Sequence, residues 1–135
     1  MDFGGVSFLG ILIATAVAFV IGGAYCGLLA KPWMKAARID PQDANMSAML
    51  FINSIVCELI MAFMLAGVIG HLGTGEGTAI NGMISGFFIW LGFVATTLAV
   101  NHRYQNFGWD LTLIDGLHWL LVLLAMGAII GWFAP

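Results

Sequence analysis

The chain has 135 residues, of which 61% are hydrophobic and 8% are charged, and its mean hydropathy is +1.02. Soluble domains carry about 25% charged residues, so this composition excludes an ordinary soluble globular protein. Four basic residues and a net charge of -3 also exclude a nucleic-acid-binding protein. Because about 20 apolar residues cross a bilayer core, the chain has room for four spans. We predict an all-α integral membrane four-helix bundle that forms one domain, residues 1–135.

The first predicted span covers residues 6–29. Small residues recur at every fourth position along it, which places them on one stripe of the helix: Gly10, Ala14, Ala18 and Gly22. Such stripes let helix backbones approach closely in a membrane, although Gly and Ala are also simply common in membrane helices. The span is expected to end near Lys31 and Pro32, because proline disfavours helical geometry at the residue before it.

A polar connection, residues 31–46, follows the first span. Its mixture of basic and apolar side chains suits a short helix lying on the membrane surface. The second span is predicted over residues 47–70, and one carboxylate, Glu58, lies close to its middle. Ser54 shares a helix face with Glu58 because the two are four residues apart, and Asn53 lies on the neighbouring face.

The third span, residues 79–101, and the fourth span, residues 111–133, each contain two glycines four residues apart. The pairs are Gly82 with Gly86 and Gly127 with Gly131. This spacing is typical of close contacts between membrane helices, so both pairs are predicted to lie at helix interfaces.

Polar side chains also occur within the second and third spans. They are interpreted as hydrogen-bonding groups between helices or as the lining of a polar path, and packing alone explains them without a path. These candidates are Asn53, Ser54, Asn81, Thr96 and Thr97.

The basic residues predict the orientation of the chain. All of them lie in the first and third connections, at Lys31, Lys35, Arg38 and Arg103. Cytoplasmic loops of membrane proteins are enriched in Lys and Arg, so both connections are expected in the cytoplasm and both termini outside. We therefore predict an N-out/C-out, multi-pass protein of the bacterial inner membrane, with a short cytoplasmic interfacial segment between the first two spans.

Two stretches resemble a known family. Residues 22–34, Gly-Gly-Ala-Tyr-Cys-Gly-Leu-Leu-Ala-Lys-Pro-Trp-Met, are similar to the end of the first span in the bacterial domain-of-unknown-function family numbered 1761. Residues 101–121, with Asn-Phe-Gly-Trp at 106–109 and Leu-Ile-Asp-Gly at 113–116, resemble its last connection and span. The resemblance covers the whole length and implies small four-span membrane proteins. It implies no activity, because none is established for the family.

Glu58 is the strongest candidate for a functional residue. An ionised carboxylate in hydrocarbon costs several kcal/mol, so such residues often mark ion or proton pathways. The functional interpretation is a site that handles a proton or a cation, inside the bundle or at an oligomer axis. The alternative is a protonated carboxyl that hydrogen-bonds to a neighbouring helix and has only a structural role.

Asp115 and His118 are the next candidates. Their spacing of three places them on one face of the fourth span, and His118 is expected at a depth close to that of Glu58. A Glu58–His118–Asp115 series would resemble the proton relays of membrane transporters. Alternatively, Asp115 supports the positive start of its helix, and His118 lies at the membrane interface.

The sequence contains no catalytic, nucleotide-binding or metal-ligand motif, and Cys26 and Cys57 lack ligand spacing. We therefore expect no enzyme activity, no cofactor and no metal site. The favoured hypothesis is an oligomeric transporter or channel-like protein. The alternative is a non-catalytic accessory subunit of a larger membrane complex. The expected partners are the lipid bilayer and either further copies of the chain or another membrane protein.

Overall fold

The computed structural model describes residues 6–44, 46–73 and 75–134, and these residues form helices joined by short connections. The helices are α1 (Phe8–Ala37), α2 (Ala48–Gly70), α3 (Ala79–Ile89), the π-helical η1 (Trp90–Ala95), α4 (Thr96–Tyr104) and α5 (Trp109–Trp132). Because α3, η1 and α4 follow one another directly, they form one rod. In the described residues, four helical segments are long and apolar enough to cross a membrane. The predicted all-α, four-span fold is confirmed.

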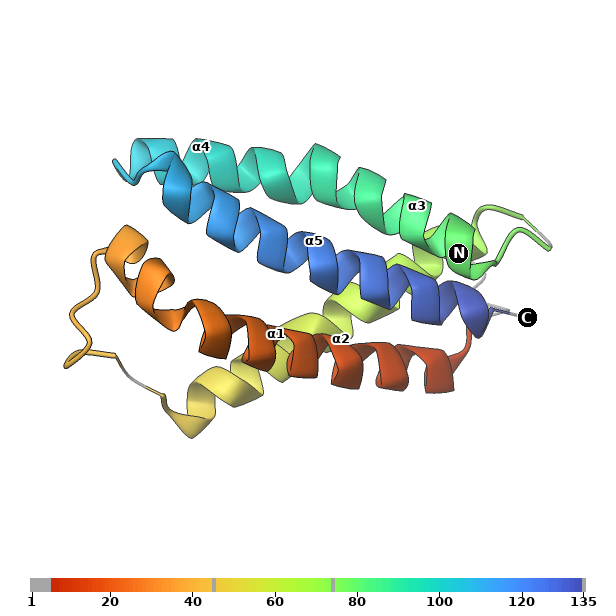
Figure 1. Cartoon of the computed structure of the whole chain (residues 1–135). Coiled ribbons are helices and arrows are strands. Elements are labelled where there is room, and N and C mark those ends of the chain that lie inside the picture. Colours follow the sequence, from red (N-terminus) through yellow and green to blue (C-terminus); the bar gives the residue numbers. More distant parts are fainter. Residues whose placement is uncertain (1–5, 45, 74, 135) are drawn as a thin grey trace.

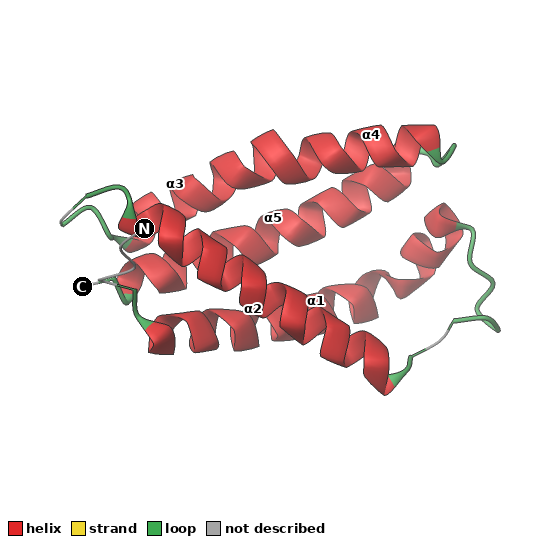
Figure 2. Ribbon diagram, turned by 180° about the vertical axis from the view of Figure 1, so that it is seen from behind, coloured by secondary structure: helices red, strands yellow, loops and turns green. Residues whose placement is uncertain are grey.

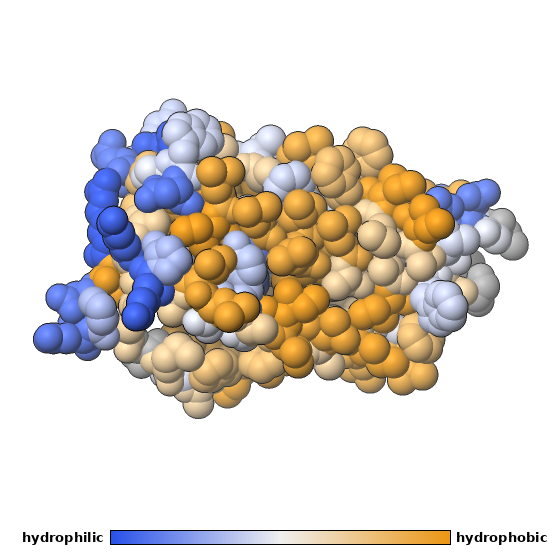
Figure 3. All heavy atoms as spheres, in the orientation of Figure 1, coloured by the Kyte–Doolittle hydropathy of each residue, from blue (hydrophilic) through white to orange (hydrophobic). Residues whose placement is uncertain are grey.

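The helices run alternately up and down, with α5 at the centre. Helix α5 lies between α1 and the α3–η1–α4 rod, and α2 crosses α1 at a steep angle on the far side (Figures 1 and 2). The α1–α2 and α4–α5 connections therefore lie at one end of the molecule, which we call the basic end because it carries Lys31, Lys35, Arg38 and Arg103. The surface between the two ends is mostly hydrophobic (Figure 3).

Hydroxyl side chains fix where three of the helices begin. Ser7, Ser47 and Thr78 precede α1, α2 and α3, and each side chain accepts a hydrogen bond from a backbone N–H of the first turn. Such caps satisfy donors that have no partner within the helix. The described spans therefore start close to the positions predicted from the sequence.

Helix α1 bends where the first span was expected to end. Leu29 departs from helical geometry, with φ -107° and ψ 16°, but the helix then continues through Pro32 to Ala37. Proline lacks an N–H and its ring clashes with the carbonyl one turn earlier, so it breaks the hydrogen-bond ladder without ending the helix. The separate surface helix expected after residue 31 is instead the last part of α1, bent away from its axis (Figure 1).

Glycine pairs bring α3 and α5 into direct backbone contact. A Cβ on Gly82 would collide with the carbonyl oxygen of Gly127, and one on Gly127 would collide with that of Gly82. Gly86 and Gly131 likewise face carbonyl oxygens of the opposite segment. Only glycine leaves room for this approach, so Gly82 and Gly127 meet directly, while Gly86 packs on Leu123 and Gly131 on Thr78.

The hydrophobic core lies where α1, α2 and α5 meet, in the half of the bundle farthest from the basic end. Small residues on α1 let the larger side chains of α2 and α5 fill the space between the helices. The most buried members of this core are Ala14, Ala18, Ala62, Leu65, Ile69, Val122, Leu123 and Met126. Gly10, which begins the small-residue stripe, lies against Phe133.

The first half of α2 leaves the bundle. Residues 48–57 are exposed on all sides in the described chain, and the helix becomes buried only from Glu58 onward. Both ribbon views show the start of α2 lying away from the other helices (Figures 1 and 2). Glu58 therefore stands at the point where α2 enters the bundle.

Candidate functional site

Glu58 is buried at the crossing of α2 and α1. Its side chain is 4% exposed, and its Oε2 has no hydrogen-bond partner among the described residues. The opposing residue on α1 is Gly22, whose missing side chain leaves the space that the carboxyl occupies. The carboxylate thus faces the inside of the bundle, where a charge is expensive.

His118 approaches the same glycine from α5. A Cβ on Gly22 would lie 3.2 Å from His118 Nε2 and 3.7 Å from Glu58 Oε1. His118 Nε2 is also buried without a hydrogen-bond partner in the described part of the chain. The structure therefore brings Glu58 and His118 together around Gly22, and each side chain has one buried polar atom left unpaired.

Asp115 lies one turn away from His118 on α5 but has other partners. The indole Nε1 of Trp33 donates to Asp115 Oδ1 at 3.0 Å, and His102 Nε2 lies 3.6 Å from Asp115 Oδ2. No hydrogen bond or ion pair joins Asp115 to His118 among the described residues. The expected direct series through all three residues is therefore interrupted between His118 and Asp115.

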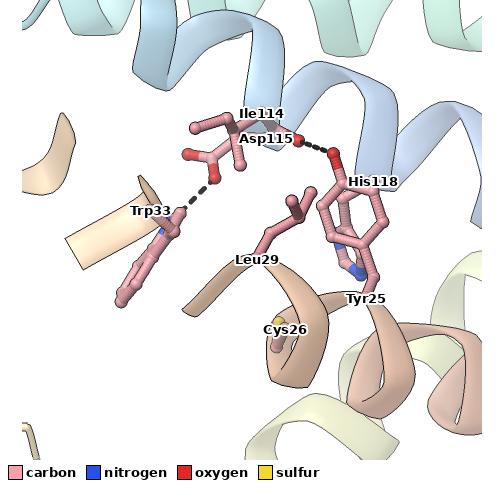
Figure 4. Close-up of a pocket in the computed structure, with 7 residues that line it drawn as sticks. All are labelled: Tyr25, Cys26, Leu29, Trp33, Ile114, Asp115 and His118. Carbon is pink, nitrogen blue, oxygen red and sulfur yellow. Dashed lines mark hydrogen bonds between the residues drawn. The ribbon is translucent and has the colours of Figure 1, made fainter. Parts of the chain in front are cut away.

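A small cavity lies between α5 and the bend of α1, and both Asp115 and His118 line it (Figure 4). Its volume is about 40 Å³. A cavity that admits one water needs roughly 10–15 Å³ for the centre of the molecule, so this one is large enough. The lining residues are Tyr25, Cys26, Leu29, Trp33, Ile114, Asp115 and His118.

Tyr25 joins α1 to α5 at the inner end of the cavity. Its hydroxyl donates to the carbonyl oxygen of Ile114 at 2.8 Å, and its ring lies 5.3 Å from that of His118, centroid to centroid (Figure 4). His118 therefore belongs to both parts of the site. Its ring lines the cavity, and its Nε2 lies beside Glu58.

A polar network continues from Asp115 to the basic end. His102 is buried, and its Nδ1 lies 3.1 Å from the hydroxyl of Thr112. Arg103 Nη2 donates to the same hydroxyl at 3.0 Å and to the carbonyl of Gly108 at 2.8 Å. These bonds hold the end of α4 against the start of α5, and they connect Asp115 to a cationic side chain through His102.

Sequence reasoning gave no site role to Tyr25, Trp33 or His102. The short connection between the third and fourth spans was the available signal for His102, because it forces the end of one helix to lie beside the start of the next. No comparable signal pointed to Tyr25 or Trp33, whose partners are on α5, far away in the sequence.

The family model described as Protein of unknown function (DUF1761) matches residues 9–131. The chain belongs to this family. No curated protein and no solved structure matches the chain significantly. The resemblance seen in the sequence is confirmed. The matched region of this DUF1761 protein includes Glu58, His118, Asp115 and the whole lining of the cavity.

The other polar candidates in this DUF1761 protein lie outside the site. Asn53 and Ser54 are exposed on the part of α2 that leaves the bundle, and Thr96 and Thr97 are exposed on α4. Ser54 and Thr96 donate to carbonyl oxygens one turn earlier in their own helices. Asn81 donates to the connection that precedes α3. Thr96 lines a mostly apolar hollow between α4 and α5, and the lining of this hollow does not include Glu58 or His118.

The polar side chains around Gly22 are one acid and one base, Glu58 and His118. No three His, Cys, Asp or Glu side chains in the described residues gather closely enough to hold a metal ion. Cys26 and Cys57 are both free and exposed on their helices. No hydrogen bond joins the two side chains in the described residues, but a carboxyl group and an imidazole can each hold, donate and accept a proton.

Proposed function

We propose that this protein handles protons inside the membrane, with Glu58 and His118 as the groups that bind and release them. The observation that supports the proposal is the pair of unpaired polar atoms, Glu58 Oε2 and His118 Nε2, buried beside Gly22. Leaving a buried polar atom without a partner costs about 1–3 kcal/mol, so a purely structural pair would be expected to satisfy both atoms.

The pair holds one proton without net charge. Glu58 as a neutral acid beside a neutral His118 imidazole carries no charge, and this state is the least costly in hydrocarbon. Gaining a second proton makes the imidazole cationic, and losing the first makes the carboxyl anionic. Each change therefore creates a charge that must be passed on, which is the behaviour of a transfer site. A proton is favoured over a metal cation because no three His, Cys, Asp or Glu side chains gather within the described residues.

The test is proton flux in proteoliposomes with an imposed pH gradient. Glu58→Gln keeps the shape of the side chain but cannot release a proton, so we expect flux to fall about tenfold or more, towards that of empty liposomes. Glu76→Gln, which changes an exposed acid in the α2–α3 connection, is the matched control and should leave flux unchanged. Equal flux in wild type and Glu58→Gln, with normal helix content in both, would exclude the proposal. No enzymatic step is involved.

We further propose that the protein lies in the bacterial inner membrane with the basic end in the cytoplasm. The support is that Lys31, Lys35, Arg38 and Arg103 all lie at one end of the described molecule. Positive charge near membrane spans sets this orientation.

A second candidate function is that of an accessory subunit. It is favoured by the first half of α2, residues 48–57, whose residues are all exposed although Phe51 contacts the Phe19 ring of α1, and which carries the polar Asn53. Native mass spectrometry after gentle solubilisation separates the candidates. A homo-oligomer without other chains supports a self-contained transporter or channel-like protein. A complex with a different membrane protein at a fixed ratio supports the accessory function.

A further inference from the structure

The cavity at the bend of α1 lies between the basic end and the buried acid–base pair. Trp33 and Asp115 form its outer end, and Tyr25 and His118 form its inner end (Figure 4). Trp33 and Tyr25 are eight positions apart on α1, which corresponds to about 12 Å along a helix. The cavity therefore extends from the polar network of the basic end to the imidazole that lies beside Glu58.

The bend in α1 is the cause of this space. In a straight helix, the backbone around Leu29 would continue alongside α5. Pro32 has no N–H to donate to the backbone carbonyl one turn earlier, so the helical hydrogen-bond ladder is broken there. Leu29 takes non-helical backbone angles as a result. The two helices are then joined across the gap by side chains, Tyr25 to the Ile114 carbonyl and Trp33 to Asp115, instead of by close packing.

The opposite side of the pair is sealed by apolar packing. Beyond Glu58 and His118, α1, α2 and α5 meet through side chains that are at most 2% exposed, among them Ala14, Ala62 and Met126. Thr15 is a buried polar residue in this half, and its hydroxyl donates to the Ile11 carbonyl at 2.9 Å.

We infer that the cavity is a water-filled access path to the Glu58–His118 pair, open towards the basic end and closed towards the other end of the molecule. This inference rests on the proposed proton function and specifies the side from which protons reach the site. Buried water needs two to four polar partners, and the lining offers the Asp115 carboxylate, the His118 ring, the Tyr25 hydroxyl and the Cys26 thiol.

Asp115 has a defined part in this path. Its carboxylate stands at the outer end, oriented by the Trp33 indole N–H and by His102. A fixed negative group at the mouth of a narrow passage attracts protons and excludes anions. Asp115 is thus a positioning group for water and protons, and it acts on Glu58 only through the cavity and His118.

Cys26 provides a natural reporter, because its thiol lines the cavity. The full chain with Cys57→Ser is reconstituted in vesicles, and Ag⁺, which is about as large as a water molecule and does not cross lipid, is added to one side. Thiols that have not reacted are then alkylated after denaturation and counted by mass spectrometry. A cysteine-free chain with Lys35→Cys, labelled by an impermeant maleimide, identifies the side that the basic end faces.

We expect Ag⁺ to react with Cys26 at least about tenfold faster from the side of the basic end than from the other side, because thiols react as thiolates in water. The matched control is Cys26→Ser, which leaves Cys57 on the outer surface of α2, away from the cavity; this thiol should react slowly from both sides. Equal reaction of Cys26 from both sides, faster reaction from the far side, or no reaction from either side would each overturn the inference.

The outcome is independent of flux. In Glu58→Gln, Cys26 should react from the same side and at the same rate as in the parent chain, because the carboxyl lies beyond the cavity. If Cys26 reacts from one side only and proton flux is unchanged in Glu58→Gln, the access path is supported and the proton function is excluded. Reduced flux in Glu58→Gln together with an unreactive Cys26 would keep the function and remove this path.

Discussion

Trp33 donates its indole N–H to Asp115 at 3.0 Å and so attaches the segment after the bend of α1 to the start of α5. The bond joins residues 82 positions apart in the chain. It satisfies a carboxylate close to the membrane interface and holds the outer end of the cavity together. The bend is therefore a fixed part of the fold, stabilised on its far side by a side-chain contact.

Trp33→Phe removes this donor and keeps an aromatic ring. A hydrogen bond to a charged group contributes about 1.5–3 kcal/mol, so we expect a comparable loss in the free energy of unfolding, measured in detergent by urea titration. Trp132→Phe is the control, because Trp132 is 76% exposed and lies at the opposite end of the bundle. Equal stability of the two variants would show that the Trp33–Asp115 bond does not hold the bent segment.

Gly22→Ala tests the space shared by Glu58 and His118. The added methyl would lie 3.2 Å from His118 Nε2, closer than ordinary contact, so the imidazole must move. We expect proton flux in proteoliposomes to fall severalfold while the helix content stays normal. Gly23→Ala is a matched control on the next residue, where a Cβ meets nothing within 4 Å. Equal proton flux in Gly22→Ala and Gly23→Ala would contradict the placement of Glu58 and His118 around Gly22.

Gly127→Ala tests the backbone contact between α3 and α5. The methyl would collide with the Gly82 carbonyl, and backbone cannot yield as a flexible side chain does. Overpacking of this kind costs about 1–3 kcal/mol, which a thermal or urea denaturation series in detergent will register. Gly92→Ala, whose Cβ has open space, should lie within about 1 kcal/mol of wild type. A Gly127→Ala variant as stable as Gly92→Ala would refute this contact.

The orientation gives a fourth prediction, tested with single cysteines in a cysteine-free chain. Glu76→Cys, in the α2–α3 connection, should react with an impermeant maleimide added to intact cells or spheroplasts. Lys35→Cys, near the end of α1, should react only after the membrane is permeabilised, because basic segments stay in the cytoplasm. The reverse pattern of labelling would place the basic end outside.

The spans themselves were predictable, because length and hydropathy decide them almost alone. The glycine pairs that begin at Gly82 and Gly127 were also visible in the sequence, since glycines four residues apart commonly mark close contacts between membrane helices. Pro32 correctly marked a disturbance in the first helix. Whether the helix ends or bends there depends on what the following residues contact, and the contact from Trp33 to Asp115 lies far away in the sequence.

The site was predictable only in part. Spacing placed Asp115 and His118 on one face, but it does not say which neighbouring helix each residue meets. In the structure, α1 and α4 supply the partners of Asp115, and α1 and α2 supply the neighbours of His118. Periodicity likewise grouped Ser54 with Glu58. The steep crossing of α2 separates them, because the helix leaves the bundle between the two residues.

The π-helical turn Trp90–Ala95 decides which way the end of the third span faces. Gly86 and His102 both lie against α5, although 16 positions of regular α-helix would rotate them about 160° apart. A π-helical turn holds about one extra residue and so takes up about 100° of that rotation. The Trp90 indole fixes the turn by donating to the Gly116 carbonyl at 2.7 Å. Removing one residue from this segment would leave a regular α-helix with Gly86 and His102 in the same relative phase, whereas the full-length segment wound as a regular α-helix would turn His102 away from α5. The π-helical turn therefore absorbs one extra residue in the third span, so that both ends of the span stay in register with α5.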